Sequence, residues 1–417
     1  MNTFNKISVV GLGYIGLPTA AVFANHGVQV VGTDTSQSVV DSINAGKPHF
    51  GEPDLDALVR RVVENGKLSA SNEVQTADAF LVAVPTPLCE GRDKDFGADL
   101  SYVQAAAEAI APALVKGNLV ILESTSPVGT TEKMARWMAD LRPDLSFPHD
   151  KGEMADINIA HCPERVLPGR IIEEVVNNAR VIGGMTRKCA QRALSLYRIV
   201  VQGECRVTNA RTAEMSKLTE NAYRDVNIAF ANELSVICDR HKINVWELIQ
   251  MANLHPRVAI LSPGPGVGGH CIAVDPWFIV DGAPEDARII RMARQINDAM
   301  PDYICGKVVT RAQSLVNPVI ACLGLSYKAD VGDLRESPAV EIVAQLADQG
   351  VAELLVVEPH ISALPKDLSD RGLKLTDFDM AIEQANVILL LVDHNAFMHI
   401  DRDMIKDKFV IDTRGAW

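Results

Sequence analysis

The sequence lacks an excess of basic charge: Lys and Arg total 40 against 53 Asp and Glu, a formal net charge of −13. Nucleic acids and anionic membranes carry negative phosphates, so neither is expected as the main partner. Long apolar runs are lacking too, since none reaches the roughly 18 residues of a membrane span. The apolar start, residues 7–23, is interrupted by glycines and a proline, so it is not expected to act as a secretion signal.

Cysteine pairs are also missing, because the eight cysteines are scattered and include no Cys-x-x-Cys motif. Disulfide frameworks and zinc sites usually require regular cysteine spacing. We therefore expect reduced thiols, no metal and a cytoplasmic location. At 417 residues the chain is too long for one hydrophobic core, so two or three domains are expected.

A dinucleotide-binding pattern is present near the N-terminus. The run Ile7–Val10 predicts a buried strand, and Gly-x-Gly-x-x-Gly, a helical pattern and a second strand at Gln29–Gly32 follow. In this fingerprint the glycines allow a tight turn, close approach to a pyrophosphate and helix packing, and an acid binds the ribose. That acid is Asp34, which would repel a 2′-phosphate and so favours NAD over NADP. The predicted cofactor contacts here are Gly11, Gly13, Tyr14, Ile15, Gly16 and Asp34.

Strands and helices continue to alternate, and polar residues follow several strands. Thr86 and Thr125 come after predicted strands 79–84 and 119–123, at carboxyl ends where ligands collect in parallel sheets. They are candidate NAD contacts, although ordinary loop or helix-cap threonines would give the same pattern. Glu164 and Arg165 follow strand 157–162, and they suit either a site or, more commonly, a surface ion pair.

A long helix is predicted from Thr212 to about His241, since this stretch has no proline or glycine and its apolar residues recur at helical spacing. Lys217, Asn221 and Arg224 share one face of it. Such a face is either solvated or lines a cleft for a charged, phosphorylated ligand. A helix of this length between two α/β halves suits an interdomain spine and a dimer interface.

The stretch Pro263–Asp275 crowds two Pro-Gly pairs and a Gly-Gly immediately before Cys271. Proline and glycine exclude helix and central strand, so this is a loop whose backbone approaches something closely. Backbone N–H groups beside a thiol favour the thiolate and hold a developing oxyanion. Cys271 is therefore either a nucleophile or a buried apolar residue, as most cysteines are.

The C-terminal third begins the α/β pattern again, with strands predicted at 319–325, 354–357, 387–392 and 409–412. Ser337-Pro338 predicts a helix N-cap and first turn. Only Gly324 follows the first of these strands, so this second doubly wound domain need not hold NAD. The predicted domains are 1–206, 207–300 and 301–417: two Rossmann-like domains joined by a helical segment that carries the Cys271 loop.

Together these motifs resemble the UDP-glucose/GDP-mannose dehydrogenase family over essentially the whole chain, and most closely its branch that oxidises UDP-N-acetylhexosamines. The matching stretches are Gly11–Gly16, Cys162–Pro168, Thr219–Asp225, His255–Val258, Pro263–Trp277, Gly324–Pro338 and Asp412–Gly415. The stretch Cys89–Asp99 departs from the pattern. The resemblance implies an NAD-dependent four-electron oxidation at C6 of the sugar, through a thiohemiacetal and a thioester on Cys271. UDP-N-acetyl-D-mannosamine is the expected substrate, and UDP-N-acetyl-D-glucosamine is the alternative.

The resemblance also assigns roles by residue. The implied catalytic residues are Cys271, Lys217, Asn221, Asp275 and Glu164, and Arg335 is matched to NAD. The implied substrate contacts are Arg165, Val166, Lys217, Asn221, Arg224, His255, Arg257, Gly268, Tyr327, Lys328 and Arg414. A homodimer through the central helical domain is expected. Two alternatives remain: a single-step oxidoreductase or epimerase with a structural Cys271, and a non-catalytic nucleotide-sugar sensor.

Overall fold

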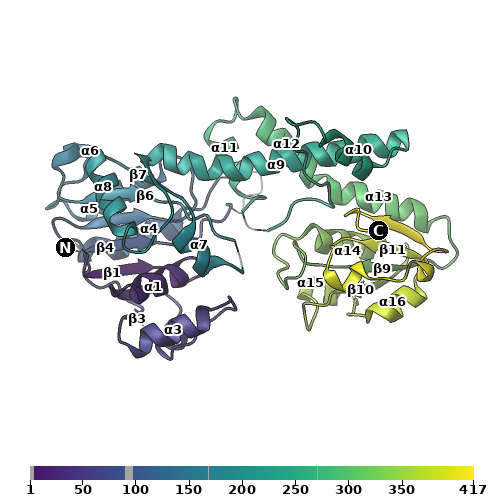
Figure 1. Cartoon of the computed structure of the whole chain (residues 1–417), viewed down its shortest axis with the longest axis horizontal. Helices are drawn as coiled ribbons and strands as arrows, with labels where there is room; N and C mark the ends of the chain where they lie inside the picture. Colours follow the sequence, from purple (N-terminus) through teal and green to yellow (C-terminus); the bar gives the residue numbers. More distant parts are fainter. Residues whose placement is uncertain (1–3, 90–96, 168, 270) are drawn as a thin grey trace. The chain divides into compact units, whose positions relative to one another are not determined.

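The computed structural model describes residues 4–89, 97–167, 169–269 and 271–417, so Pro168 and His270 of the predicted motifs and most of 89–99 lie outside the description. The chain forms two compact units, Met1–Glu220 and Asn221–Trp417 (Figure 1).

The first unit is built on an eight-stranded sheet in the order β3-β2-β1-β4-β5-β6-β7-β8. The strands are β1 (Lys6–Val10), β2 (Gln29–Thr33), β3 (Leu68–Ser71), β4 (Ala79–Val82), β5 (Leu119–Leu122), β6 (Asn158–His161), β7 (Arg180–Gly184) and β8 (Cys205–Asn209). All neighbours pair in parallel except β6 and β7, which are antiparallel. Edge strand β8 pairs with β7 along its whole length and spans the domain boundary predicted at 206.

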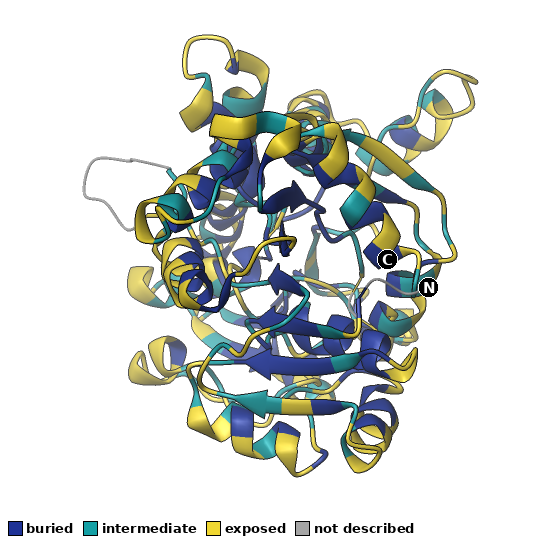
Figure 2. Ribbon diagram, turned by 90° about the vertical axis from the view of Figure 1, so that its left-hand side faces the viewer, coloured by how far each residue is buried: buried dark blue, intermediate teal, exposed yellow. Residues whose placement is uncertain are grey.

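Helices cover both faces of this sheet because its central strands are apolar on both sides. Ile7 and Val9 belong to one buried cluster, while Phe80 and Val82 belong to another. Figure 2 shows these buried strands in dark blue, flanked by helices with exposed outer faces. The helices are α1 (Gly16–Asn25), α2 (Gln37–Asn44), α3 (Leu55–Glu64), α4 (Ser101–Ile110), α5 (Thr130–Leu141), α6 (Pro148–Lys151), α7 (Ile171–Asn177) and α8 (Arg187–Tyr197).

The predicted long helix is α9 (Ala210–His241), which begins in the first unit and ends in the second. Asn209 accepts the Thr212 N–H at 2.9 Å and so satisfies one of the free donors at the start of the helix. At the other end Lys242 takes φ 58°, and the Ile243 N–H closes the last turn on the Cys238 carbonyl at 2.9 Å. Among the described residues, no helix is both long and apolar enough to cross a bilayer.

The second unit continues with helices α10 (Val245–Ala252), α11 (Asp275–Gly282), α12 (Arg288–Asp298) and α13 (Met300–Ala312). A four-stranded parallel sheet follows, in the order β10-β9-β11-β12. Its elements are β9 (Val319–Leu323), α14 (Pro338–Gln349), β10 (Glu353–Val357), α15 (Lys366–Asp370), α16 (Phe378–Gln384), β11 (Val387–Leu390), α17 (Asn395–Met398) and β12 (Phe409–Asp412). Helix α13 spans the predicted boundary at 300, and its apolar side joins the core of this sheet through Met300, Ile304 and Val308.

The predicted fold class is confirmed: two Rossmann-like parallel-sheet domains and a helical segment containing one long helix. The predicted cap at Ser337 is also confirmed, because its side chain accepts the Ala339 N–H at the start of α14. The predicted strands are found, with ends shifted by at most two residues.

Candidate active site

The glycine turn of the first unit has the geometry that a bound dinucleotide requires. Gly11 has φ 91°, and a Cβ there would lie 2.5 Å from the Ala83 carbonyl oxygen. A Cβ on Gly16 would lie 1.8 Å from the Gly11 oxygen, so any side chain would prevent α1 from starting here. Gly13 is different, since a Cβ there meets nothing within 4 Å. The open side of Gly13 and the N-terminus of α1 therefore suit a pyrophosphate.

Asp34 closes this turn from the end of β2. Its carboxylate accepts the Leu12 N–H at 3.0 Å and the Ser36 N–H at 2.9 Å. These bonds fix the acid beside the glycines, where the fingerprint places the ribose. The residues present thus fit NAD.

Tyr14 contacts a residue that the sequence did not point to. Its ring stacks on Phe50 with centroids 4.8 Å apart, and its hydroxyl donates to Glu52 at 3.2 Å. Buried Glu52 also accepts the N–H groups of Gly169 and Ile171, both at 2.9 Å. It joins segments over a hundred residues apart in sequence, so no local pattern could have identified it.

The loops after β4 and β5 are held together at the carboxyl edge of the sheet. Thr86 donates its hydroxyl to the Thr125 carbonyl at 2.5 Å, and Ser124 donates to the Val84 carbonyl at 2.7 Å. The two threonines predicted to contact NAD are therefore neighbours, although their contact with the cofactor stays a prediction.

Glu164 does not form the surface ion pair that its position also allowed. Its carboxylate lies 2.6 Å from Arg180, with both side chains under a tenth exposed, and it also accepts the Arg165 N–H at 2.8 Å. Arg165 pairs instead with Glu220 at 2.5 Å. Arg180 is on β7, so its part in this site could not be read from local sequence.

A second buried carboxyl lies in the same cluster. Glu123 accepts the Tyr197 hydroxyl at 2.5 Å, and Arg180 stacks over the Tyr197 ring at 4.9 Å. Burial raises the pKa of Glu123 to about 7, against the opposing effect of Arg180. Burial thus favours the protonated form of this carboxyl relative to an exposed glutamate.

In the second unit, Cys271 is exposed and starts a turn that leads into α11. The N–H groups of Val274 and Asp275 donate to the Cys271 carbonyl at 3.1 and 2.9 Å. Asp275 is the first residue of α11, and its buried carboxylate accepts the Asn221 amide at 2.5 Å. The structure therefore brings together two of the predicted catalytic residues, one turn from the thiol.

The glycines before Cys271 lie against the loop between β9 and α14. A Cβ on Gly268 would lie 2.5 Å from the Glu336 carbonyl oxygen, and the Gly269 N–H donates to the Arg335 carbonyl at 3.2 Å. Hydrogen bonds to Asp333 raise the pKa of Arg335 most, and Cys271 adds a smaller contribution of the same sign. Cys271 thus lies close to a guanidinium, which stabilises a thiolate.

The remaining predicted substrate residues lie in several settings. Arg414 donates to Asp393 at 2.9 Å, and a Cβ on Gly264 would lie 2.8 Å from its guanidinium. His255 accepts the Arg257 N–H at 3.3 Å on an exposed turn. Arg224 and Lys328 are exposed, Tyr327 is half-buried beside Gly269, and Val166 packs at the edge of the core of the first unit. Half-buried Lys217 belongs to the first unit, whereas Asn221 and Cys271 belong to the second.

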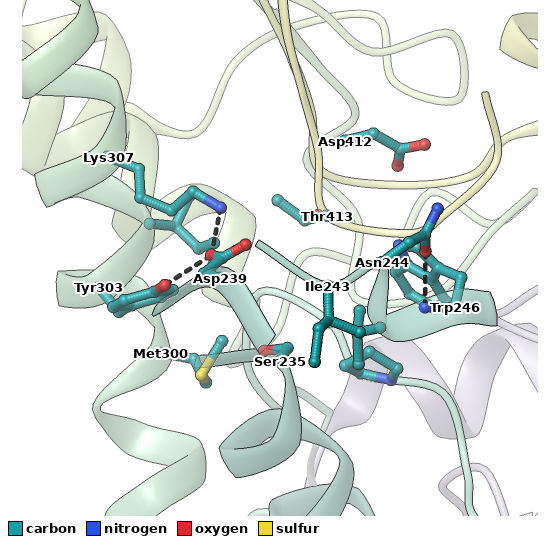
Figure 3. A pocket seen from close by; sticks show the side chains of 14 residues that line it. Ser235, Asp239, Ile243, Asn244, Trp246, Met300, Tyr303, Lys307, Asp412 and Thr413 are labelled. Atoms are coloured by element: carbon teal, nitrogen blue, oxygen red, sulfur yellow. Dashed lines mark hydrogen bonds and ion pairs between the residues drawn. The ribbon is translucent and has the colours of Figure 1, made fainter. Parts of the chain in front are cut away.

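A separate pocket of about 270 Å³ lies among α9, α10, α13 and the end of β12. Tyr303 and Lys307 point toward Asp239 there, and both donate to its carboxylate at 2.6 Å (Figure 3). Pro263 and Gly264, at the start of the Cys271 loop, also line this pocket, but none of the predicted catalytic or binding residues does.

One cluster has a composition suited to metal binding. Asp330, His360 and His394 bring ligand atoms within 4.8 Å of one another. However, His394 accepts the Asp330 N–H on Nδ1 at 2.9 Å, and its Nε2 lies 3.0 Å from Glu358. Both ring nitrogens of His394 are thus engaged, and the cluster is a hydrogen-bond network.

Comparison with known proteins gives the chain a family. Residues 5–201, 211–299 and 321–417 match the NAD binding, central and UDP binding domains of the UDP-glucose/GDP-mannose dehydrogenase family.

Relatives cover nearly the full length. An NDP-N-acetyl-D-galactosaminuronic acid dehydrogenase of Ralstonia nicotianae is 59% identical over 99% of this chain and 96% of its own. A UDP-N-acetyl-D-mannosamine dehydrogenase of Campylobacter jejuni is 57% identical over 97% of this chain and 99% of its own. The solved structure of a UDP-D-ManNAc dehydrogenase from Pyrococcus horikoshii matches with a TM-score of 0.86 and 39% identity, over 99% of this chain and 96% of that one. The chain therefore belongs to the UDP-glucose/GDP-mannose dehydrogenase family and is an NAD-dependent enzyme.

Proposed function

We propose that this enzyme oxidises C6 of UDP-N-acetyl-D-mannosamine from alcohol to carboxylate. The observation that carries the proposal is the arrangement of Cys271 on a glycine-rich loop, one turn from the buried Asn221–Asp275 pair. The similarity to UDP-N-acetyl-D-mannosamine dehydrogenases supports the choice of sugar.

The reaction proceeds on Cys271 in balanced steps. The C6 alcohol first loses a hydride and a proton to become an aldehyde, and the Cys271 thiolate adds to its carbon as a thiohemiacetal. Loss of a second hydride and proton leaves a thioester on Cys271. Water then displaces the thiolate and yields the carboxylate. NAD supplies the hydride acceptor for both oxidations.

The neighbouring residues stabilise charge and move protons. Lys217 and Asn221 donate to the oxygen that becomes negative in each addition, and Lys217 also takes part in proton transfer. An amide nitrogen carries two N–H groups, so Asp275 orients Asn221 through one of them and leaves the other for the oxygen. Asp275 or Glu164 orients the hydrolytic water. Glu164 is held in place by its ion pair with Arg180 at 2.6 Å.

A second sugar is favoured by one specific observation. The two relatives with 59% and 58% identity are named NDP-N-acetyl-D-galactosaminuronic acid dehydrogenases. N-acetyl-D-galactosamine and N-acetyl-D-mannosamine differ in configuration at C2 and C4, which the shape of the sugar pocket discriminates.

A panel assay tests the proposed function. NADH formation is followed with UDP-N-acetyl-D-mannosamine, UDP-N-acetyl-D-galactosamine, UDP-N-acetyl-D-glucosamine, UDP-glucose and GDP-mannose. The highest kcat/KM is expected with the mannosamine sugar. A higher value with the galactosamine sugar would replace the substrate, and no turnover with any of the five would reject the proposal.

We also propose that the enzyme is a homodimer through its central helices. Three large apolar residues of α9 are spaced seven apart and are 66%, 51% and 45% exposed: Tyr223, Phe230 and Ile237. Seven-residue spacing aligns side chains along one helix face, the arrangement that packs against a second helix. The wild-type protein is expected to sediment as a dimer and the Phe230→Glu variant as a monomer. A wild-type monomer at micromolar concentration would contradict this.

A further inference from the structure

One face of α9 is polar and almost wholly buried. Asn221, Asp225 and Asn232 are no more than 6% exposed, and helical periodicity places them on a single side. Helix α12 contributes two further buried polar residues, Arg294 and Asn297, at 2% and 1% exposure. Burying a polar group costs free energy unless the group is hydrogen-bonded, so the side chains of this face require hydrogen-bond partners inside the protein.

The partners form a chain of hydrogen bonds that ends on the loop carrying Cys271. Arg294 donates to Asp225 at 2.6 Å, and Asn297 donates to the same carboxylate oxygen at 2.8 Å. Asn232 donates to the Asn297 side-chain oxygen at 2.9 Å and accepts the Gly264 N–H at 2.8 Å. The chain of hydrogen bonds therefore runs from Asp225 through Asn297 and Asn232 to Gly264.

The carboxylate at the start of this chain fixes the direction of every bond. A carboxylate only accepts, so Asn297 must turn its NH₂ toward Asp225 and its oxygen toward Asn232. Asn232 must then turn its NH₂ toward Asn297 and its oxygen toward Gly264. The charge on Asp225 thereby ensures that an acceptor faces the loop.

Gly264 is the position at which such an acceptor has most effect. It lies between Pro263 and Pro265, which have no N–H, so it supplies the only backbone donor of these three residues. Two residues on, Gly266 has φ 137°, and a Cβ there would lie 3.3 Å from the Asn297 carbonyl oxygen. The loop is thus held at its start by Asn232 and approached closely by the backbone of α12.

We propose that Asn232 is a positioning residue for the thiol of Cys271, acting through the Pro263–Gly269 segment and oriented by Asp225 through Asn297. This rests on the function proposed above. The hydrogen bonds of Asn232 run to Asn297 and Gly264, so its proposed effect is on the placement of the loop. A displacement of about 1 Å in reacting atoms costs up to about 100-fold in rate, so kcat is the sensitive quantity.

Two substitutions separate positioning from general stability. Asn232→Leu removes both hydrogen bonds at similar volume. Asn232→Asp keeps an acceptor for Gly264. When the introduced carboxylate is ionised, however, one of its oxygens faces the side-chain oxygen of Asn297, and the two acceptors repel each other. The Asn297 amide cannot flip to relieve this, because its NH₂ group is bound to Asp225. When its introduced carboxyl is protonated, the Asn232→Asp variant would again donate to Asn297 and accept from Gly264. The charged groups in this network are Asp225 on α9 and Arg294 and Asp298 on α12. Residues 263–266 contribute none, and the Arg414 guanidinium lies beside Gly264.

The expected result for Asn232→Leu is a kcat about 10- to 100-fold lower with KM changed less than about threefold. Amide exchange of a peptide covering 264–269 should rise at least about tenfold. For Asn232→Asp, the ratio of its kcat to that of the wild type should rise as pH falls, whereas the ratio for Asn232→Leu should stay flat. Buried Asn118 of the first unit, which accepts the Val115 N–H and donates to Ala77, offers the matched control Asn118→Asp. That control should lower the thermal midpoint and leave the exchange of 264–269 unchanged.

The proposal is overturned if Asn232→Leu keeps kcat within twofold of the wild type, or if the Asn232→Asp ratio does not change with pH. The exchange measurement needs no substrate. A wild-type enzyme inactive on every sugar would therefore reject the proposed function, while unchanged exchange of 264–269 in Asn232→Leu would reject the positioning role.

Discussion

The two Rossmann-like domains repeat one turn and then use it differently. In the first, the Gly11 N–H donates to the Thr33 carbonyl at 2.8 Å with φ 91°. In the second, the Gly324 N–H donates to the Val357 carbonyl at 2.8 Å with φ 90°. An acid follows the second strand in both: Asp34 accepts the Leu12 N–H at 3.0 Å, and Glu358 accepts the Leu325 N–H at 2.7 Å.

What lies beyond the turn differs. In the first unit α1 begins at Gly16, so its N-terminal donors stand beside the open side of Gly13. In the second, helix α14 begins only at Pro338, and the intervening loop lies against the glycines of the Cys271 segment. Glu358 is paired there with fully buried His394. The same strand–turn–strand unit thus offers a dinucleotide site in one domain and a support for the Cys271 loop in the other.

Within this comparison, the largest effect is expected from a substitution that blocks the first turn and leaves the fold intact. Gly13→Val fills space that no protein atom occupies, so it should weaken NAD binding and leave the packing of the protein unchanged. We expect kcat/KM for NAD to fall about 100-fold, because the branched side chain blocks the close approach of a pyrophosphate. Steady-state kinetics and a thermal midpoint close to the wild type check this.

The counterpart Gly324→Ala should do the reverse, destabilising by about 1–3 kcal/mol through a clash with Val392 while KM for NAD is kept.

The two acids offer a narrower comparison. Asp34→Ala should raise KM for NAD about tenfold and improve the use of NADP, since the ribose loses an acceptor and the 2′-phosphate loses a repelling charge. Glu358→Gln should leave KM for NAD unchanged. Equal effects of the two substitutions on KM for NAD would refute the division of roles.

The smallest expected effect is on the pH dependence of the free energy of unfolding, which should have opposite signs in the two units. Burial raises the pKa of Glu123 to about 7, so the folded state binds more protons than the unfolded state between about pH 4.5 and 7. The free energy of unfolding should therefore fall as pH rises through that range. Burial also opposes the ionisation of Glu358, but hydrogen bonds from His394, Leu325 and His360 outweigh it and lower its pKa to about 2. Its contribution is lost as pH falls from about 4.5 toward 2.

Amide exchange of β5 and β9 over a pH series measures the two slopes separately. Glu123→Gln should flatten the slope for β5 above pH 4.5, and Glu358→Gln should flatten the slope for β9 below it. A β5 peptide that became better protected as pH rose from 4.5 to 7 would contradict the assignment for Glu123.

Local sequence predicted the elements that local rules determine. The glycine turn, the long helix and the Ser337 cap each follow from a few neighbouring residues. The reversal at β7 and the extent of β8 did not follow, because strand direction and pairing depend on the rest of the sheet. The partners of Glu164, Tyr14 and Gly264 were also missed, since each bond joins segments far apart in sequence.

The stoichiometry of NADH formation tests the central claim, the covalent role of Cys271, most directly. With limiting UDP-sugar the wild-type enzyme should form two NADH per sugar and release the carboxylate, and Cys271→Ser should lose about 10³-fold or more of this turnover. One NADH per sugar with release of the aldehyde, or a Cys271→Ser enzyme that still makes the acid at a comparable rate, would contradict it.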